Sequence, residues 1–190
     1  IANERTTYVV SARRSYFDLF LPFASGSVRN STVYFYDLNA RLSHKLATND
    51  ILFASAYLGR DLFAYPIAEM GFGNKALSLR WNHIFNDNNY MNVVLHGVES
   101  DYKITMDLDE ATKASIGSTI KDIGLKTEFT SKIGDSSTLG YGLQFTRHHF
   151  QPGTARGDGD KSMMGEVKMP ANNAIEAALF LGNTHKVGNA

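Results

Sequence analysis

A run of one arginine and two histidines is the part of the sequence most suggestive of metal chemistry. Arg147, His148 and His149 are consecutive, and imidazole nitrogens are common ligands of zinc and other transition metals. Adjacent residues of a β-strand point to opposite faces, however, so two consecutive histidines in a strand do not readily share one ion. The flanking sequence offers neither cysteine nor a nearby acidic partner. We therefore predict a strand-end position near a membrane interface, and no metal site.

A glycine-rich segment at 157–162, GDGDKS, is the second candidate. Its Asp158 and Asp160 weakly resemble a calcium-binding loop, but the remaining acidic or amide ligands and the closing glutamate are missing. A solvated loop is the favoured interpretation, and calcium in the 157–162 loop is the weaker alternative. The sequence shows no phosphate-binding glycine loop, nucleophile elbow or pair of catalytic carboxylates, so we predict that the chain is not an enzyme and carries no cofactor.

The composition narrows the remaining classes. The 190 residues include 19 basic and 19 acidic side chains, and this balance argues against a nucleic-acid-binding protein. Cysteine is absent, so neither a disulfide framework nor a thiolate metal site can form. No apolar run approaches the roughly 20 residues of a membrane-spanning helix. If this chain crosses a membrane, it must do so with strands.

Alternation of apolar and polar residues, which is typical of β-strands, recurs along the whole chain. No linker separates the alternating segments, so we predict one segment of a single domain over 1–190. The eight segments are 6–15, 32–47, 51–63, 76–89, 90–104, 122–133, 138–150 and 174–185. Most match the roughly 9 to 11 residues of a membrane-crossing strand better than the roughly 5 to 6 of a soluble one. The alternation leaves the two faces of 90–104 unassigned.

The connections between these segments alternate in length. Three are tight turns rich in Asn, Asp, Gly and Ser, within ATND, NDNN and GDSS. The others are longer: about 16 residues around FDLFLPFASGSVRN, about 10 around AYPIAEMGFG and over roughly 20 after residue 150. Short periplasmic turns and long extracellular loops are typical of an outer-membrane barrel. We therefore predict an all-β fold, the wall of an antiparallel transmembrane β-barrel with about eight meander strands.

The alternation also separates charged from apolar side chains. Seven charged residues share one parity and are predicted to line a polar lumen: Asp37, Arg41, Asp61, Arg80, Lys126, Glu128 and Glu176. Eight large apolar residues share the other parity and are predicted to face lipid: Leu38, Leu42, Leu77, Leu79, Trp81, Leu125, Leu143 and Leu179. Three histidines near turns are predicted to lie at the periplasmic interface: His44, His83 and His185.

The most apolar loop is FDLFLPF, at 17–23. Exposed apolar patches are unfavourable unless they are used. The favoured interpretation is a segment folded against the barrel mouth or against a plug inside it. The alternative is a contact surface for a ligand or for a surface lipoprotein.

Four stretches resemble the barrel of TonB-dependent outer-membrane receptors, most closely those of Bacteroidetes-type bacteria. The combination of Arg-Arg-Ser-Tyr-x-Asp with Arg-Trp-Asn-His is fairly specific to that group. The stretches are VVSARRSYFDLFLP (9–22), FYDLNARLSHKLATNDILFASAYLGRDLF (35–63), LSLRWNHIFNDNNYMNVVLHGVESDY (77–102) and DIGLKTEFT (122–130). Receptors of this family have a 22-stranded barrel, a plug domain inside it and a TonB box ahead of the plug.

The resemblance implies that the chain is an internal segment of such a barrel in the bacterial outer membrane, without the plug or the TonB box. Its implied function is import of a scarce nutrient, such as a glycan, a peptide or a metal chelate. Its implied partners are outer-membrane lipid, the rest of the barrel, the plug, the TonB energy-transducing complex through other segments, and a surface lipoprotein lid. Two alternatives stay open: a self-contained small outer-membrane barrel, and a soluble all-β ligand-binding domain that exposes Arg80 to water.

Overall fold

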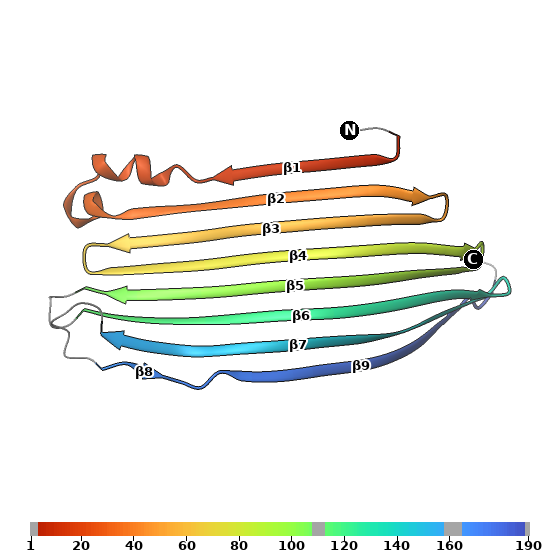
Figure 1. Cartoon of the computed structure of the whole chain (residues 1–190). Coiled ribbons are helices and arrows are strands. Elements are labelled where there is room, and N and C mark those ends of the chain that lie inside the picture. The colour runs from red at the N-terminus through yellow and green to blue at the C-terminus, as the bar shows by residue number, and fades with distance from the viewer. Residues whose placement is uncertain (1–3, 108–112, 158–164, 189–190) are drawn as a thin grey trace.

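The computed structural model describes residues 4–107, 113–157 and 165–188, and its strands form one antiparallel sheet (Figure 1). Each long strand pairs with the next along the chain, and β9 lies beside β7. The strands are β1 (Thr6–Arg14), β2 (Thr32–Ala47), β3 (Asp50–Tyr65), β4 (Ala68–Asn86), β5 (Asn89–Met106), β6 (Ala114–Ile133), β7 (Ser137–Gly157), β8 (Val167–Lys168) and β9 (Asn172–His185). The predicted all-β meander is confirmed, with the two-residue β8 as an addition to the eight expected strands.

The two ends of the sheet differ in their connections. At the end that we call the turn end, two residues join β2 to β3, two join β4 to β5 and three join β6 to β7. The last of these turns contains Gly134 with a φ of 63°, a conformation that favours glycine. At the opposite, loop end, residues 15–31 form three short 3₁₀ helices, η1 (Phe17–Leu19), η2 (Leu21–Phe23) and η3 (Gly26–Asn30).

Two of the predicted long loops are wrong, because the strands extend further than the alternation suggests. β3 reaches Tyr65 and β4 begins at Ala68, so Pro66 and Ile67 form a two-residue turn where about 10 residues of loop were expected. β7 continues to Gly157, which leaves 158–171 as the connection to β9. Backbone pairing extends these strands even where the side chains do not alternate.

The sheet is a single open layer without a hydrophobic core. Leu21 is the one buried apolar side chain among the described residues. The accessible surface is 13228 Å², against about 9,000 Å² for a compact monomer of 21.0 kDa. β1 pairs only with β2, and β9 only with β7, so each has one unpaired edge within the described sheet.

None of the helices in the described part of the chain is long and apolar enough to cross a membrane.

Candidate functional site: a sheet with two different faces

The register of the sheet places its side chains on two faces of different chemistry. Directly paired residues on neighbouring antiparallel strands point to the same side, so rows of side chains can be followed across the sheet. One row contains Tyr8, Leu42, Ala54, Leu79, Leu95, Leu125, Phe145 and Ala177, and its side is called the leucine face. The neighbouring row on the opposite side contains Val9, Arg41, Ser55, Ser78, His96, Gly124, Thr146 and Glu176, and its side is called the arginine face.

The residues selected from the sequence divide between these faces without exception. All eight residues predicted to face lipid lie on the leucine face, together with His44, His83 and His185. All seven residues predicted to line a lumen lie on the arginine face. The register also assigns the segment 90–104, in which Leu95 lies on the leucine face and His96 on the arginine face. Contact with lipid or with a lumen stays a prediction.

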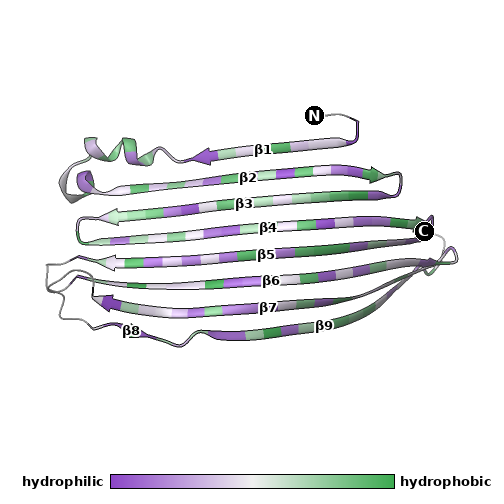
Figure 2. Ribbon diagram, in the orientation of Figure 1, coloured by the Kyte–Doolittle hydropathy of each residue, from purple (hydrophilic) through white to green (hydrophobic). Residues whose placement is uncertain are grey.

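Apolar side chains on the leucine face form a belt with polar or charged residues at both edges. On β3 the edges are Arg60 and Asp50, and on β4 they are Lys75 and His83. The two edges of a strand are eight to ten residues apart, which corresponds to about 27 to 34 Å along the strand. Figure 2 shows hydrophobic residues gathering toward the turn end of the later strands.

The belt crosses the strands obliquely. Rows on this face are two residues apart, and each edge moves two rows toward the turn end between the first and the last strands. The loop-side edge runs through Arg14, Arg60, Lys75, Glu99, Lys121 and Arg147; the turn-side edge runs through Thr6, His44, Asp50, His83, Asn89, Ser131 and Asn183. Each edge therefore shifts by about 14 Å along the strands over about 29 Å across the sheet. The strands are accordingly tilted by about 25° from the direction perpendicular to the belt.

Aromatic and histidine side chains gather at the turn-side edge. Trp81 Nε1 donates a hydrogen bond to Asp50 Oδ1 at 2.9 Å, and His83 Nδ1 lies 2.7 Å from the same oxygen. In the row of His83, the rings of Phe129 and Tyr141 stack with their centroids 5.4 Å apart. Rings with one polar atom and an apolar body are typical of the boundary between a membrane and water.

The loop-side edge carries an ion-pair ladder that the sequence analysis missed. Lys75 Nζ lies 2.7 Å from Glu99 Oε1, and Lys121 Nζ lies 3.0 Å from Glu99 Oε2. These residues lie beyond the belt. The hydrogen bonds from Lys75 and Lys121 lower the pKa of Glu99, and the bond to Glu99 raises the pKa of Lys75. Their shared parity with Leu77 and Ile123 was the signal available in the sequence.

A glycine makes room for a second ion pair at this edge. Arg60, Gly73 and Asp101 are successive members of one row, and Arg60 Nη1 reaches across β4 to Asp101 Oδ2 at 3.4 Å. A Cβ at Gly73 would overlap Asp101 Oδ1 and lie 3.1 Å from Arg60 Nη1. Gly73 therefore interrupts the alternation in the sequence but belongs to the sheet.

Several charges of the arginine face have a partner on the same face. Arg13 Nη2 lies 2.7 Å from Asp37 Oδ2, and the Arg80 guanidinium carbon lies 4.3 Å from the centre of the Phe53 ring. Lys126 Nζ lies 3.5 Å from a carboxylate oxygen of Glu128. Because the cations are exposed and paired mainly with neighbours on the same face, this arrangement suits a wet or polar surface better than a hydrocarbon one.

The arginine face also has polar features without an internal partner. A hollow of about 440 Å³ is lined by Arg41, Ser78, His96 and other residues of this face. The side-chain oxygens Oδ1 of Asn82 and Asn92, which pair in register, are buried with no hydrogen-bond partner in the described structure.

The histidine pair at 148–149 is placed differently from the prediction. His148 Nδ1 lies 2.8 Å from Asp122 Oδ1 on the arginine face, whereas His149 Nδ1 lies 3.0 Å from Asn173 Oδ1 on the leucine face. The expected opposite orientation is confirmed. The expected strand-end position is wrong, because β7 continues past these residues, through a bulge opposite Ser118, to Gly157. The acidic partner comes from a neighbouring strand, which sequence proximity could not reveal.

The two predicted loop sites have different outcomes. Asp158 and Asp160 lie outside the described residues. In the segment at 17–23, Leu21 is buried, whereas the Phe23 side chain is 87% exposed. Both interpretations of that apolar loop stay open as predictions.

Comparison with known proteins gives one structural likeness. No family model matches the chain, and neither does any curated protein. Among solved structures, the translocator domain of autotransporter NalP from Neisseria meningitidis aligns with a TM-score of 0.49 and 13% sequence identity. The alignment covers 78% of this chain and 51% of that chain, so the chain spans about half the length of that domain. A likeness of this degree defines no family.

Proposed function

We propose that this chain forms part of the wall of an outer-membrane β-barrel, with the leucine face toward lipid and the arginine face toward the lumen. The oblique apolar belt is the observation that carries the proposal. Its width of about 27 to 34 Å along the strands becomes about 25 to 31 Å across a membrane at a tilt of 25°. The apolar band of such barrels is about 25 Å tall and is flanked by aromatic girdles. The belt has that height and such a girdle at its turn-side edge.

The exposure of both faces supports a membrane location over a soluble sandwich. A soluble β-domain covers its apolar face with a second layer, and the described residues contain no second layer over the leucine face. Leu79, in the middle of the belt, is 42% exposed. In hydrocarbon the unpaired edges of β1 and β9 would be costly, so in the barrel these edges must pair with each other or with further strands.

A finer proposal is that the barrel belongs to a TonB-dependent receptor that imports a scarce nutrient through a plugged lumen. The four sequence stretches that resemble this family support it. The charged and polar side chains of the arginine face suit a surface that docks a polar plug. In this role the chain encloses the lumen and positions the plug. The plug and the TonB complex would supply the gating.

The first experiment is to determine the intact mass and terminal sequences of the polypeptide after detergent extraction from the native outer membrane. A mass several times the 21.0 kDa of this chain supports one wall of a large receptor. A mass of 21.0 kDa would instead favour a small barrel, and release without detergent would favour the soluble alternative. For the import step, loss of the protein and loss of TonB should impair growth on the same limiting nutrient.

A further inference from the structure

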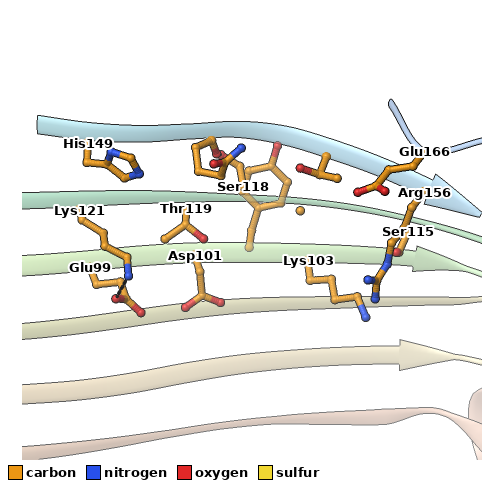
Figure 3. Close-up of a pocket in the computed structure, with 14 residues that line it drawn as sticks. Glu99, Asp101, Lys103, Ser115, Ser118, Thr119, Lys121, His149, Arg156 and Glu166 are labelled. Carbon is orange, nitrogen blue, oxygen red and sulfur yellow. Dashed lines mark hydrogen bonds and ion pairs between the residues drawn. The ribbon is translucent and has the colours of Figure 1, made fainter. Parts of the chain in front are cut away.

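A hollow on the leucine face lies beyond the loop-side edge of the apolar belt. It has a volume of about 630 Å³ and lies over β5, β6 and β7 (Figure 3). Lys103, Lys121 and Arg156 line it together with the hydroxyl groups of Ser115 and Thr119. The bulge opposite Ser118 distorts β7 at this point, and the neighbouring Gly117 contributes no side chain to fill the space.

Two of the three carboxylates at this hollow are already engaged in ion pairs. Glu99 is held by Lys75 and Lys121, and Asp101 by Arg60. Glu166 is the third carboxylate that lines the hollow, and His149 also lines it.

Lys103 and Arg156 form no ion pair within the described residues. Figure 3 shows both side chains extending toward the same part of the hollow. Three lysines and arginines, Lys103, Lys121 and Arg156, line the hollow together with three carboxylates, so the formal charges of the lining balance. Because Glu99 and Asp101 are already paired, Lys103 and Arg156 are the two cationic groups available for an anion.

An apolar groove adjoins this charged hollow on the same face. The groove has a volume of about 620 Å³ and shares Glu99 and Lys121 with the charged hollow. Its floor includes Ala56 and Gly97, which are small, and Leu77 is among its larger lining residues. The nearest atom to a Cβ placed at Gly97 would be 3.8 Å away, so the groove is open above this residue. An acyl chain fits such a groove by its chemistry.

From this continuity we infer that the two hollows together bind one phosphorylated lipid of the outer leaflet. Its phosphate would lie against Lys103 and Arg156, and an acyl chain would lie in the groove over Gly97. The inference rests on the proposed orientation of the leucine face toward lipid. It adds a specific lipid site to the general contact with the membrane that the barrel requires.

The test is a titration of the full-length protein in detergent with lipid A that carries its phosphates, followed by native mass spectrometry. The double variant Lys103→Gln, Arg156→Gln removes the two available cations. Each basic group near an anionic lipid surface is worth about a fivefold change in affinity, so we expect about 30-fold weaker binding. The matched control, Lys45→Gln with Lys132→Gln, removes two cations from the arginine face near the turn end and should leave the affinity within about twofold.

Two further arms separate lipid from free anion. Lipid A stripped of its phosphates should bind the wild-type protein about as weakly as the phosphorylated lipid binds the variant. Inorganic phosphate at millimolar concentration should not displace the lipid. Equal weakening in both double variants, full binding of the dephosphorylated lipid, or displacement by inorganic phosphate would each overturn the inference.

The proposed function is checked independently in the same preparation. Each variant should fractionate with the outer membrane and migrate differently before and after heating, as folded barrels do. If the wild-type protein fails that check, the membrane assignment itself fails. If the wild-type protein passes and the double variant and its matched control bind the phosphorylated lipid equally well, only the lipid site is wrong.

Discussion

Arginine placed in the middle of the belt should distinguish the two faces of the sheet. Leu79 lies four residues from Lys75 and four from His83, so it is equally far from both edges of the belt on β4. Four residues correspond to about 14 Å along the strand and about 12 Å along the membrane normal at the inferred tilt. The guanidinium of a Leu79→Arg variant could not reach either edge without distorting the bilayer. Such a residue costs about 2 to 4 kcal/mol at the midplane of a barrel, which lowers the folding equilibrium constant about 30- to 900-fold.

Ser78→Arg is the matched control, one residue away on the arginine face. Ser78 lines the hollow of about 440 Å³ on that face, where a long polar side chain has room and water. We expect the free energy of unfolding of this variant to stay within about 0.5 kcal/mol of the wild-type value. The assay is reversible unfolding by denaturant of the protein refolded into lipid vesicles, monitored by heat-dependent migration. An equal loss of unfolding free energy in the two variants, or a larger loss for Ser78→Arg, would refute the assignment of the leucine face to lipid.

Three further outcomes follow from individual contacts. Gly73→Val should lower the free energy of unfolding by about 1 to 3 kcal/mol, because the new side chain would occupy the space of the ion pair that crosses β4. The control, Gly140→Val, has open space around the new side chain and should lower it by less than about 1 kcal/mol. Trp81, the one tryptophan of the chain, should be quenched by brominated lipids and shielded from aqueous iodide; strong quenching by iodide would contradict its position. Glu99→Gln should speed the reaction of Lys75 with amine reagents at pH 9, because the bond to Glu99 raises the pKa of Lys75 and its loss leaves more neutral amine; an unchanged rate would show that the ladder does not persist in solution.

The strands and their two faces could be predicted because alternation is a local property. The spacing of Leu77, Leu79 and Arg80 fixes which side of one strand is apolar before any neighbour is known. Antiparallel pairing then preserves the assignment, since directly opposed residues share a face. For this reason the predicted faces of Arg41 and Lys126, on strands far apart in the sheet, coincide in the structure.

The extents of the strands and the ion pairs could not be predicted in the same way. The first half of β4 does not alternate, because Gly71 and Gly73 stand where apolar side chains would be expected. Their role depends on Arg60, which approaches both glycines. The partner of Arg60, Asp101, is 41 residues away in the sequence. Contacts of this kind require the register, which short segments of sequence do not determine.

The oblique course of the belt connects these local patterns to the shape of the whole molecule. A flat, soluble sheet needs no particular alignment of its apolar residues with a plane that cuts across the strands. A barrel in a membrane does, because closure tilts every strand by the same amount relative to one bilayer. Both edges of the belt move by the same two rows across the sheet, so its width stays nearly constant while its direction departs from the strand pairing. In the proposed barrel, a single plane of solvent change that crosses tilted strands would account for both observations. It would also explain why Lys75, Glu99 and Lys121 carry charge although they share the parity of the leucines, because the proposal places them beyond that plane.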